Sequence, residues 1–293
     1  MSIIASLMGL IVLLIRAIRV IPRRISVFLW TVPFLRMCIP VGLNSRYSLM
    51  TLISRFTTKT VTVYQPIDGI SFSATNSLMA ANSYFPLTYK VNLLEDMFAV
   101  ASLIWLIVAL AIILALGILY FTTLREIKGA KHLRDNVYLS EKVQSPAVYG
   151  IFKQRIILPS SYESSDNRYI INHENTHIRR GDNLWRILVF LIAAVHWFNP
   201  LSWLFLKLFL ADLELACDES AISEYNEKQR KEYARALVDI AESKSLFVSA
   251  FGGAKIRTRV DNILSYKRMT WLSLLGFSAL ILSVITVLLT NAG

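Results

Sequence analysis

Long apolar runs alternate along this chain with short polar segments that carry most of its basic residues. A helix needs about 20 consecutive apolar residues to cross a bilayer. Residues 97–124 and 269–293 contain no charged side chain, so each run predicts a transmembrane helix. Residues 187–206 form a third run of sufficient length, interrupted by Asn199 and Pro200. The pattern therefore predicts an α-helical integral membrane protein.

Two further apolar runs lie near the N-terminus. Residues 1–15 are uncharged, and residues 25–43 contain one charge, Arg36, and two prolines that predict a kink. The first run lacks a basic start and ends at an arginine, unlike a cleaved secretory signal. We therefore predict two N-terminal transmembrane helices within residues 1–43, and about four transmembrane helices in the whole chain.

The basic residues orient these helices. They cluster between the first two runs, after the run 97–124 and before the last run, at Arg16, Arg19, Arg23, Arg24, Arg125, Lys128, Lys131, Arg134, Lys255, Arg257, Arg259, Lys267 and Arg268. The three clusters share one side if the N-terminus lies outside, and the positive-inside rule makes that side the cytoplasm. Residues 44–96 then form an extracytoplasmic loop, residues 125–268 form a cytoplasmic domain, and both termini lie outside.

Composition supports a membrane protein over a soluble or nucleic-acid-binding one. Hydrophobic residues make up 55% of the chain and charged residues 17%, whereas soluble domains carry about 25% charged residues. The net charge of +11 comes from clusters beside apolar runs, so we expect no direct nucleic-acid partner. Cys38 and Cys217 do not suggest a secreted disulfide framework, and we expect both to be small buried hydrophobic residues.

A polar motif in the cytoplasmic region predicts metal chemistry. Residues 171–182 have the sequence INHENTHIRRGD, in which His173 and His177 are four apart and share one face of a helix. Two imidazoles so placed can bind a single Zn²⁺, and Glu174 can reach a metal-bound water as general base. The alternative is a surface helix with two solvated histidines.

A third protein ligand would leave one coordination position open for water. Glu214 lies 37 residues after His177 in a predicted helix, and Asp218 follows one turn later. We predict that Glu214 is the third ligand and that Asp218 orients a ligand histidine. Because Asp212 and Glu219 are also acidic, the alternative is a solvated helix face.

The apolar run 187–206 lies between these ligands. A single crossing would place His177 and Glu214 on opposite sides of the bilayer, where they could not bind one ion. The zinc site therefore requires a re-entrant segment that turns back near Asn199–Pro200. His196 within this run is expected to be a core or interfacial histidine.

These motifs resemble a known family. HENTH, RRGD, HWFNP and ELACDE occur in the order found in the BlaR/MecR antirepressor family of bacterial membrane metallopeptidases, and QSPAVYGIFKQRIILP (residues 144–159) resembles its lead-in to the catalytic helix. The resemblance spans roughly residues 97–290. It implies an embedded α+β gluzincin-like zinc metalloprotease domain whose active site faces the cytoplasm of a bacterial plasma membrane.

The resemblance also implies roles for individual residues. His173, His177 and Glu214 match the zinc ligands, Glu174 matches the catalytic base, and Asp218 matches the acid after the third ligand. Residues 144–159 would supply an edge strand that binds the substrate backbone by strand addition, with Val148, Tyr149, Gly150 and Ile151 as the contacts. An ordinary half-buried strand is the alternative. The polar pair Asn175 and Thr176 departs slightly from the family pattern.

Well-known members continue into an extracellular penicillin-binding sensor domain, which we expect this chain to lack because it ends at Gly293, just after the last run. The expected substrate is a cytoplasmic transcriptional repressor, the chain itself, or both, and residues 243–256 are a candidate self-cleavage loop. Membrane lipid is an expected partner, and a homodimer is left open. The alternatives are a non-proteolytic signalling or scaffold protein, a purely structural zinc, and a housekeeping membrane protease.

Overall fold

The computed structural model describes residues 2–18, 21–39, 44–45, 88–163, 167–242, 254–266, 271–289 and 291–292. Most of the predicted loop 44–96 lies outside the described residues, as does most of the candidate cleavage loop 243–256. The remaining chain is mostly helical with one small mixed sheet.

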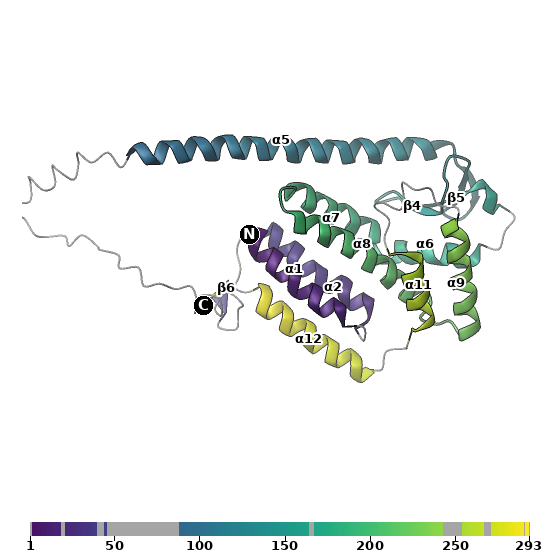
Figure 1. The fold of residues 1–293 in the computed structure, drawn as a ribbon. Coiled ribbons are helices and arrows are strands. Elements are labelled where there is room, and N and C mark those ends of the chain that lie inside the picture. The colour runs from purple at the N-terminus through teal and green to yellow at the C-terminus, as the bar shows by residue number, and fades with distance from the viewer. Residues whose placement is uncertain are drawn as a thin grey trace, which may run out of the picture.

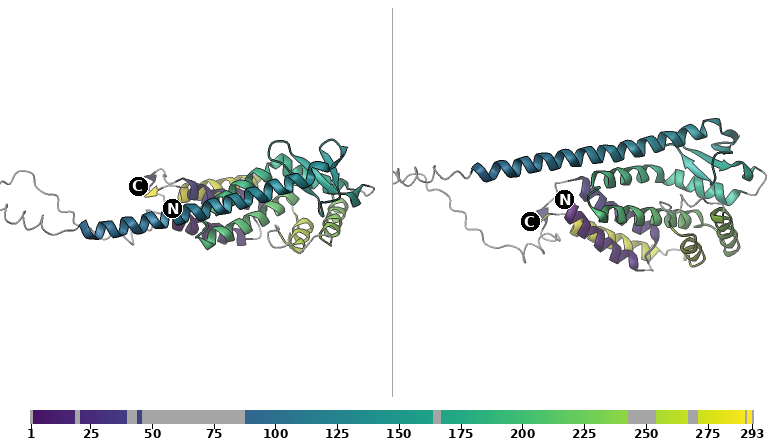
Figure 2. Two further views of the ribbon diagram at one scale, coloured as in Figure 1. Left: turned by 90° about the horizontal axis from the view of Figure 1, so that it is seen from above. Right: turned by 45° about the horizontal axis from the view of Figure 1, so that its top comes forward.

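Most long helices run side by side along one direction (Figures 1 and 2). They are α1 (Ser2–Ala17), α2 (Arg23–Cys38), α5 (Thr88–Glu126), α7 (Asp182–Val195), α8 (Pro200–Ala221) and α12 (Trp271–Leu289). One end of this bundle carries the sheet with α6 (Arg168–Arg180), α9 (Glu227–Glu242) and α11 (Ile256–Leu264). Both chain ends lie at the opposite end of the bundle (Figure 1).

The four-stranded sheet has the order β2-β3-β5-β4. Its strands are β2 (Lys131–Arg134), β3 (Val137–Ser140), β4 (Ala147–Tyr149) and β5 (Arg155–Pro159). β3 and β5 pair in parallel, whereas the two outer pairs are antiparallel. The segment 144–159, predicted to supply one edge strand, therefore contains an edge strand, β4, and an inner strand, β5. A separate short parallel pair joins β1 (Asn44–Ser45) to β6 (Asn291–Ala292).

Two hydrophobic cores hold this arrangement. The first joins α1, α2, α7 and α8, where Trp30 lies against Phe205 with ring centroids 5.4 Å apart and Phe34 lies against Phe209 at 5.7 Å. The second lies between the sheet and α6, α9 and α11, with Tyr233 fully buried at its centre. The second core supports the end of the molecule where polar residues gather.

Among the described residues, one helix is both long and apolar enough to cross a membrane, at Met97–Gly129. Its apolar side chains point outward, and Leu114 is 65% exposed, as lipid contact requires. α5 begins at Thr88, nine residues before the predicted span. The other three predicted transmembrane helices overlap α1, α2 and α12, and their crossing of the membrane stays a prediction.

The apolar run 187–206 is divided between two helices. α7 ends at Val195, the chain reverses, and α8 begins at Pro200. The Asn199 side chain accepts a hydrogen bond from the Leu201 N–H at 3.0 Å, and a proline in the first helical turn needs no N–H partner. The α7–α8 hairpin therefore brings the segments before and after the run to the same end of the bundle.

Candidate metal centre

The two histidines of the motif lie on the buried face of α6. His173 is 5% exposed and His177 is 3% exposed, and their Nε2 atoms are 3.2 Å apart. Two nitrogens that each lie about 2.0–2.1 Å from a tetrahedral zinc ion are separated by about 3.3 Å. The two imidazoles therefore have the spacing of ligands that share one metal ion. Because both are buried, the alternative of two solvated surface histidines is wrong.

A glycine and an aspartate at the end of α6 orient the second histidine. Gly181 adopts a left-handed conformation (φ 68°) and its N–H bonds the last carbonyls of the helix, so the chain can turn directly into α7. The turn brings Asp182, which is 1% exposed, within 2.6 Å of His177 Nδ1. A carboxylate that accepts from Nδ1 leaves the Nε2 lone pair for a metal. Sequence reasoning missed Asp182, although its position in RRGD was a visible signal.

The predicted third ligand faces both imidazoles from α8. Glu214 Oε1 lies 3.7 Å from His177 Nε2, and Oε2 lies 3.8 Å from His173 Nε2. Arg186 of α7 donates a hydrogen bond to Oε1. The two histidines and Glu214 therefore lie at the same end of the α7–α8 hairpin, as the zinc hypothesis requires.

Asp218, one turn further along α8, is fully buried beside the first histidine. Its Oδ1 lies 3.3 Å from His173 Nδ1 and accepts a hydrogen bond from the Tyr233 hydroxyl at 2.8 Å. The same hydroxyl lies 2.7 Å from His173 Nδ1 and can accept its proton. Tyr233 comes from α9 and carries no sequence signal. Both histidines thus have an oxygen partner on Nδ1.

Arg259 of α11 completes the buried cluster. It is 7% exposed and donates to Asp218 Oδ2 through Nε at 2.7 Å and to Oδ1 through Nη2 at 2.8 Å. Its Nη2 also lies 3.2 Å from His173 Nε2, whose single lone pair cannot bind this N–H and a metal together. Metal binding would therefore leave Arg259 with its two bonds to Asp218 and with Nη1 3.5 Å from Glu214 Oε2. The sequence predicts Arg259 only as one of the charges that orient the membrane helices, because its contact with Asp218 has no local signal.

Cys217 is a second candidate for the third ligand. The sulfur is fully buried, and together with one nitrogen of each histidine it forms a group whose atoms all lie within 4.8 Å. It lies 3.7 Å from His173 Nδ1, the nitrogen that Tyr233 contacts, whereas Glu214 faces Nε2 of both rings. The prediction that Cys217 is buried is correct, but it is more than a small hydrophobic residue. The prediction for Cys38 is wrong, because that side chain is exposed.

Charges in the cluster shift one another's pKa values. Burial alone would lower the pKa of His177, but the neighbouring Cys217 and Glu214 raise it to about 9. Burial alone would raise the pKa of Glu214, yet two imidazoles and two arginines lower it well below its usual range. Burial would also raise the pKa of Asp218, and the Arg259 guanidinium instead lowers it. The lowered pKa values keep both acids ionised beside the imidazoles, and a divalent cation would compete with protons for the imidazole nitrogens.

Glu174 and the predicted substrate strand lie next to this cluster. Glu174 is 8% exposed and directly follows His173 on α6. The carbonyls of Val148 on β4 and of Gly150 directly after it accept hydrogen bonds from the Asn183 side chain at 3.1 and 3.2 Å. Gly150 has φ 92°, and an added Cβ there would lie 2.5 Å from the Lys153 carbonyl oxygen. A glycine is therefore needed at this turn, and Asn183 ties the edge strand to the start of α7.

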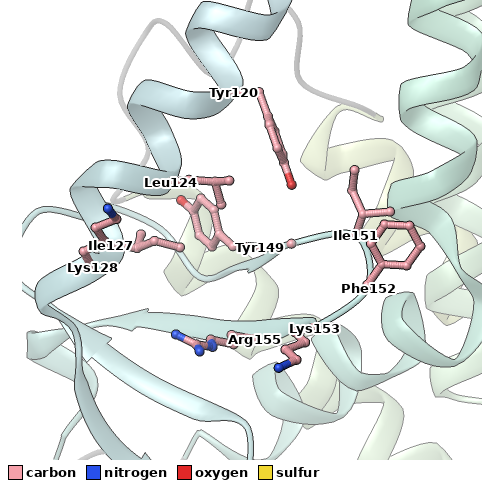
Figure 3. Close-up of a pocket in the computed structure, with 10 residues that line it drawn as sticks. Tyr120, Leu124, Ile127, Lys128, Tyr149, Ile151, Phe152, Lys153 and Arg155 are labelled. Carbon is pink, nitrogen blue, oxygen red and sulfur yellow. The ribbon is translucent and has the colours of Figure 1, made fainter.

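A cavity of about 310 Å³ opens between this strand and the end of α5 (Figure 3). It is lined by Tyr120, Leu124, Ile127, Lys128, Tyr149, Gly150, Ile151, Phe152, Lys153 and Arg155. Of the four predicted substrate contacts, Val148 and Tyr149 lie on β4, whereas Gly150 and Ile151 follow it, and the carbonyls of Val148 and Gly150 are bound by Asn183. Tyr149, Gly150 and Ile151 line the cavity.

Comparison with known proteins agrees with the resemblance seen in the motifs. A family profile described as BlaR1 peptidase M56 matches residues 1–263. The chain is 25% identical over 127 residues to the regulatory protein BlaR1 of Bacillus licheniformis, covering 42% of this chain and 21% of that protein. It is 30% identical over 135 residues to BlaR1 of Staphylococcus aureus (42% and 23%) and 25% identical over 150 residues to the methicillin resistance mecR1 protein of Staphylococcus aureus (47% and 25%). The matched region spans about a quarter of each relative's length.

Proposed function

The chain belongs to the BlaR1 peptidase M56 family, and from this we propose that it is a membrane-embedded zinc metalloendopeptidase with a regulatory role. One observation carries the proposal. The Nε2 atoms of His173 and His177 are 3.2 Å apart, and both face the Glu214 carboxylate in a buried cluster. Two imidazoles and a carboxylate are a donor set typical of catalytic zinc, with the fourth position left for water.

In this proposal His173, His177 and Glu214 hold one Zn²⁺, and Asp182 and Tyr233 orient the imidazoles. A bound zinc ion would polarise the scissile carbonyl and lower the pKa of its water. Glu174 would act as the general base and acid, taking a proton from the attacking water and returning it to the leaving amine. A structural zinc site or a scaffold without activity would not need a buried carboxylate at position 174.

We propose that the substrate backbone adds as a strand along the edge of β4 that faces away from β5. Val148, Tyr149, Gly150 and Ile151 would contact it. The edge position of β4 supports this, because β5 occupies only its other side. The adjacent cavity could accept an apolar side chain of the substrate.

We further propose that the site faces the bacterial cytoplasm and that the substrate is a transcriptional repressor, the chain itself, or both. The names of the relatives, "regulatory protein" and "methicillin resistance" protein, support the regulatory part. The position of the candidate metal centre, at the end of the bundle where α5 ends near Arg125, supports the cytoplasmic orientation. A comparison of proteomes with and without Glu174→Gln tests this. One or two stabilised regulators support it, and a broad set of stabilised proteins indicates a housekeeping protease.

Metal analysis of the detergent-purified chain tests the centre itself. We expect about one zinc ion per chain in the wild type and little in His177→Ala, because two remaining ligands bind zinc weakly. His132→Ala, at an exposed histidine of β2, is the matched control and should retain the metal. A zinc content that does not change in His177→Ala would contradict the proposal.

A further inference from the structure

α8 carries two buried acids that the metal centre does not use. Asp212 is fully buried and Glu219 is 5% exposed. The alternative in which these residues belong to a solvated acidic face is therefore wrong. A buried carboxylate is costly unless it is paired, so the partners of these two acids indicate what they do.

Asp212 binds the N-terminal helices. Its Oδ2 accepts a hydrogen bond from Arg16 Nε at 2.7 Å and another from Trp30 Nε1 at 2.9 Å. Arg23 Nη1 lies 3.9 Å from the other oxygen. One carboxylate thus contacts the end of α1, the start of α2 and the middle of α2.

Glu219 binds the first turn of α2. Its carboxylate accepts from the backbone N–H groups of Arg23 at 3.1 Å and Arg24 at 3.4 Å, and Asn262 lies 3.4 Å from Oε1. In return, Arg24 Nη2 donates to the Glu219 carbonyl at 2.6 Å. The first N–H groups of a helix have no partner within it and favour a negative charge. Glu219 therefore caps α2 from a different helix.

The four acids of α8 divide between two faces. At about 100° per residue, Asp212 and Glu219 are about 20° apart around the axis, whereas Glu214 and Asp218 lie about 200–240° from Asp212. One face thus binds the α1–α2 connection, and the opposite face meets the histidines of α6. Both sets of contacts therefore depend on the axial position and the rotation of α8.

Close packing reinforces this connection. A Cβ added at Gly9 of α1 would lie 2.1 Å from the ring of Phe205 on α8. Phe205 is fully buried, so its ring has little space to move. α1 therefore lies against α8 as closely as a glycine allows, and the two helices cannot shift independently.

We propose that Asp212 and Glu219 are positioning residues for the metal centre, through which the α1–α2 pair determines where α8 presents Glu214. A movement of α1–α2 would then change the coordination of the metal. The inference rests on the proposed metal centre and adds to it a dependence on residues 2–38. A purely structural role would affect stability alone.

Cobalt binding by the full-length, detergent-purified chain distinguishes these roles, because Co²⁺ absorption reports coordination geometry. We expect Arg16→Gln to alter the absorption spectrum and to weaken Co²⁺ affinity about tenfold in a chelator competition, at the lower end of the effect of removing a supporting contact. Arg16→Lys, which can keep the ion pair, should restore most of the affinity. Asp212→Asn should repeat the Arg16→Gln result if it folds.

Phe34→Leu is the matched control, because it weakens the same α2–α8 contact in its apolar part. It should lower the melting temperature without changing the Co²⁺ spectrum. A wild-type Co²⁺ spectrum in folded Arg16→Gln would overturn the inference while leaving the metal centre in place. A wild-type chain that binds no Co²⁺ would overturn both, and a spectral change in Phe34→Leu equal to that in Arg16→Gln would overturn the specific role of the ionic contacts.

Discussion

α6 and α8 meet at one candidate site, but their residues are held in place in different ways. Ten consecutive residues contain the two histidines and Glu174 of α6, the turn at Gly181 and Asp182 at the start of α7. Helix geometry and this one turn bring them together. On α8, each acid depends on a partner from another part of the chain. Asp218 binds Arg259 and Tyr233, whereas Asp212 binds Arg16 and Trp30.

The comparison shows that neighbouring residues can position one half of a metal centre, here the local half on α6 and its turn. The other half, on α8, is positioned by contacts with helices that are distant in the sequence. The α6 half is a compact motif that any helix of this sequence would present. The α8 half depends on α1, α2, α9 and α11, which contact its acids from other parts of the chain. Substitutions in the two halves should therefore have different signatures, and the following predictions test that difference.

The largest effect is expected at the third ligand. Glu214→Gln should abolish tight zinc binding, because a neutral amide is a poor zinc ligand, whereas Cys217→Ser should retain it. Zinc content after dialysis against a weak chelator measures both. Retention of zinc by Glu214→Gln together with its loss from Cys217→Ser would show that the sulfur is the ligand and would reverse the assignment.

Next in size is the catalytic base. Glu174→Gln should lower kcat for peptide hydrolysis by about 10²–10⁴-fold, the usual contribution of general-base catalysis, with the zinc content unchanged. Hydrolysis of a quenched fluorescent peptide library by the purified protein provides the assay. Asn175→Gln, in the same turn of α6, serves as the control and should retain most activity. An undiminished kcat in Glu174→Gln would refute the assigned role.

A smaller loss is expected at the orienting carboxylate. Asp182→Asn should reduce zinc affinity about 10–100-fold, because His177 Nδ1 loses its charged acceptor. Arg180, which also donates to Asp182, provides a comparison: Arg180→Gln should have a smaller effect because it leaves the carboxylate in place. If both variants bound zinc as the wild type does, the local half of the site would not need this turn.

The smallest effect is expected at the substrate edge. Asn183→Ala removes two hydrogen bonds that hold β4, at about 1 kcal/mol each, and should raise KM severalfold with little change in kcat. Steady-state kinetics on a single peptide would separate the two constants. A fall in KM would instead show that Asn183 obstructs the edge that the substrate uses.

Predictions from the sequence were most successful where they depended on residues close together in the chain. Family membership followed from four short motifs and is confirmed by the family profile. The reversal of the chain near Asn199–Pro200 is predicted because two ligands of one ion must lie on the same side of the bilayer. The roles of the predicted ligands stay proposals. The two imidazole nitrogens have the spacing that a shared cation needs, and the Glu214 oxygens lie 3.7 and 3.8 Å from them.

Residues that act across long sequence separations were missed or misassigned. From the sequence, Arg259 is predicted only as one charge of a cluster that orients the helices, and a solvated helix face stays open as an alternative for Asp212 and Glu219. Tyr233 carried no signal at all. In each case the type of side chain is common, and its role depends on a partner 15 to 196 residues away in the sequence.

By itself, the sequence determined the apolar character of the chain, the helix that is able to span a membrane and the local geometry of the histidine motif. These properties depend on composition and on helical periodicity, which act over a few turns. Tertiary structure alone decided which acids are buried and which basic side chains pair with them. Burial makes an unpaired charge costly, so the packing of distant helices selects the partners, and no local pattern can encode that choice.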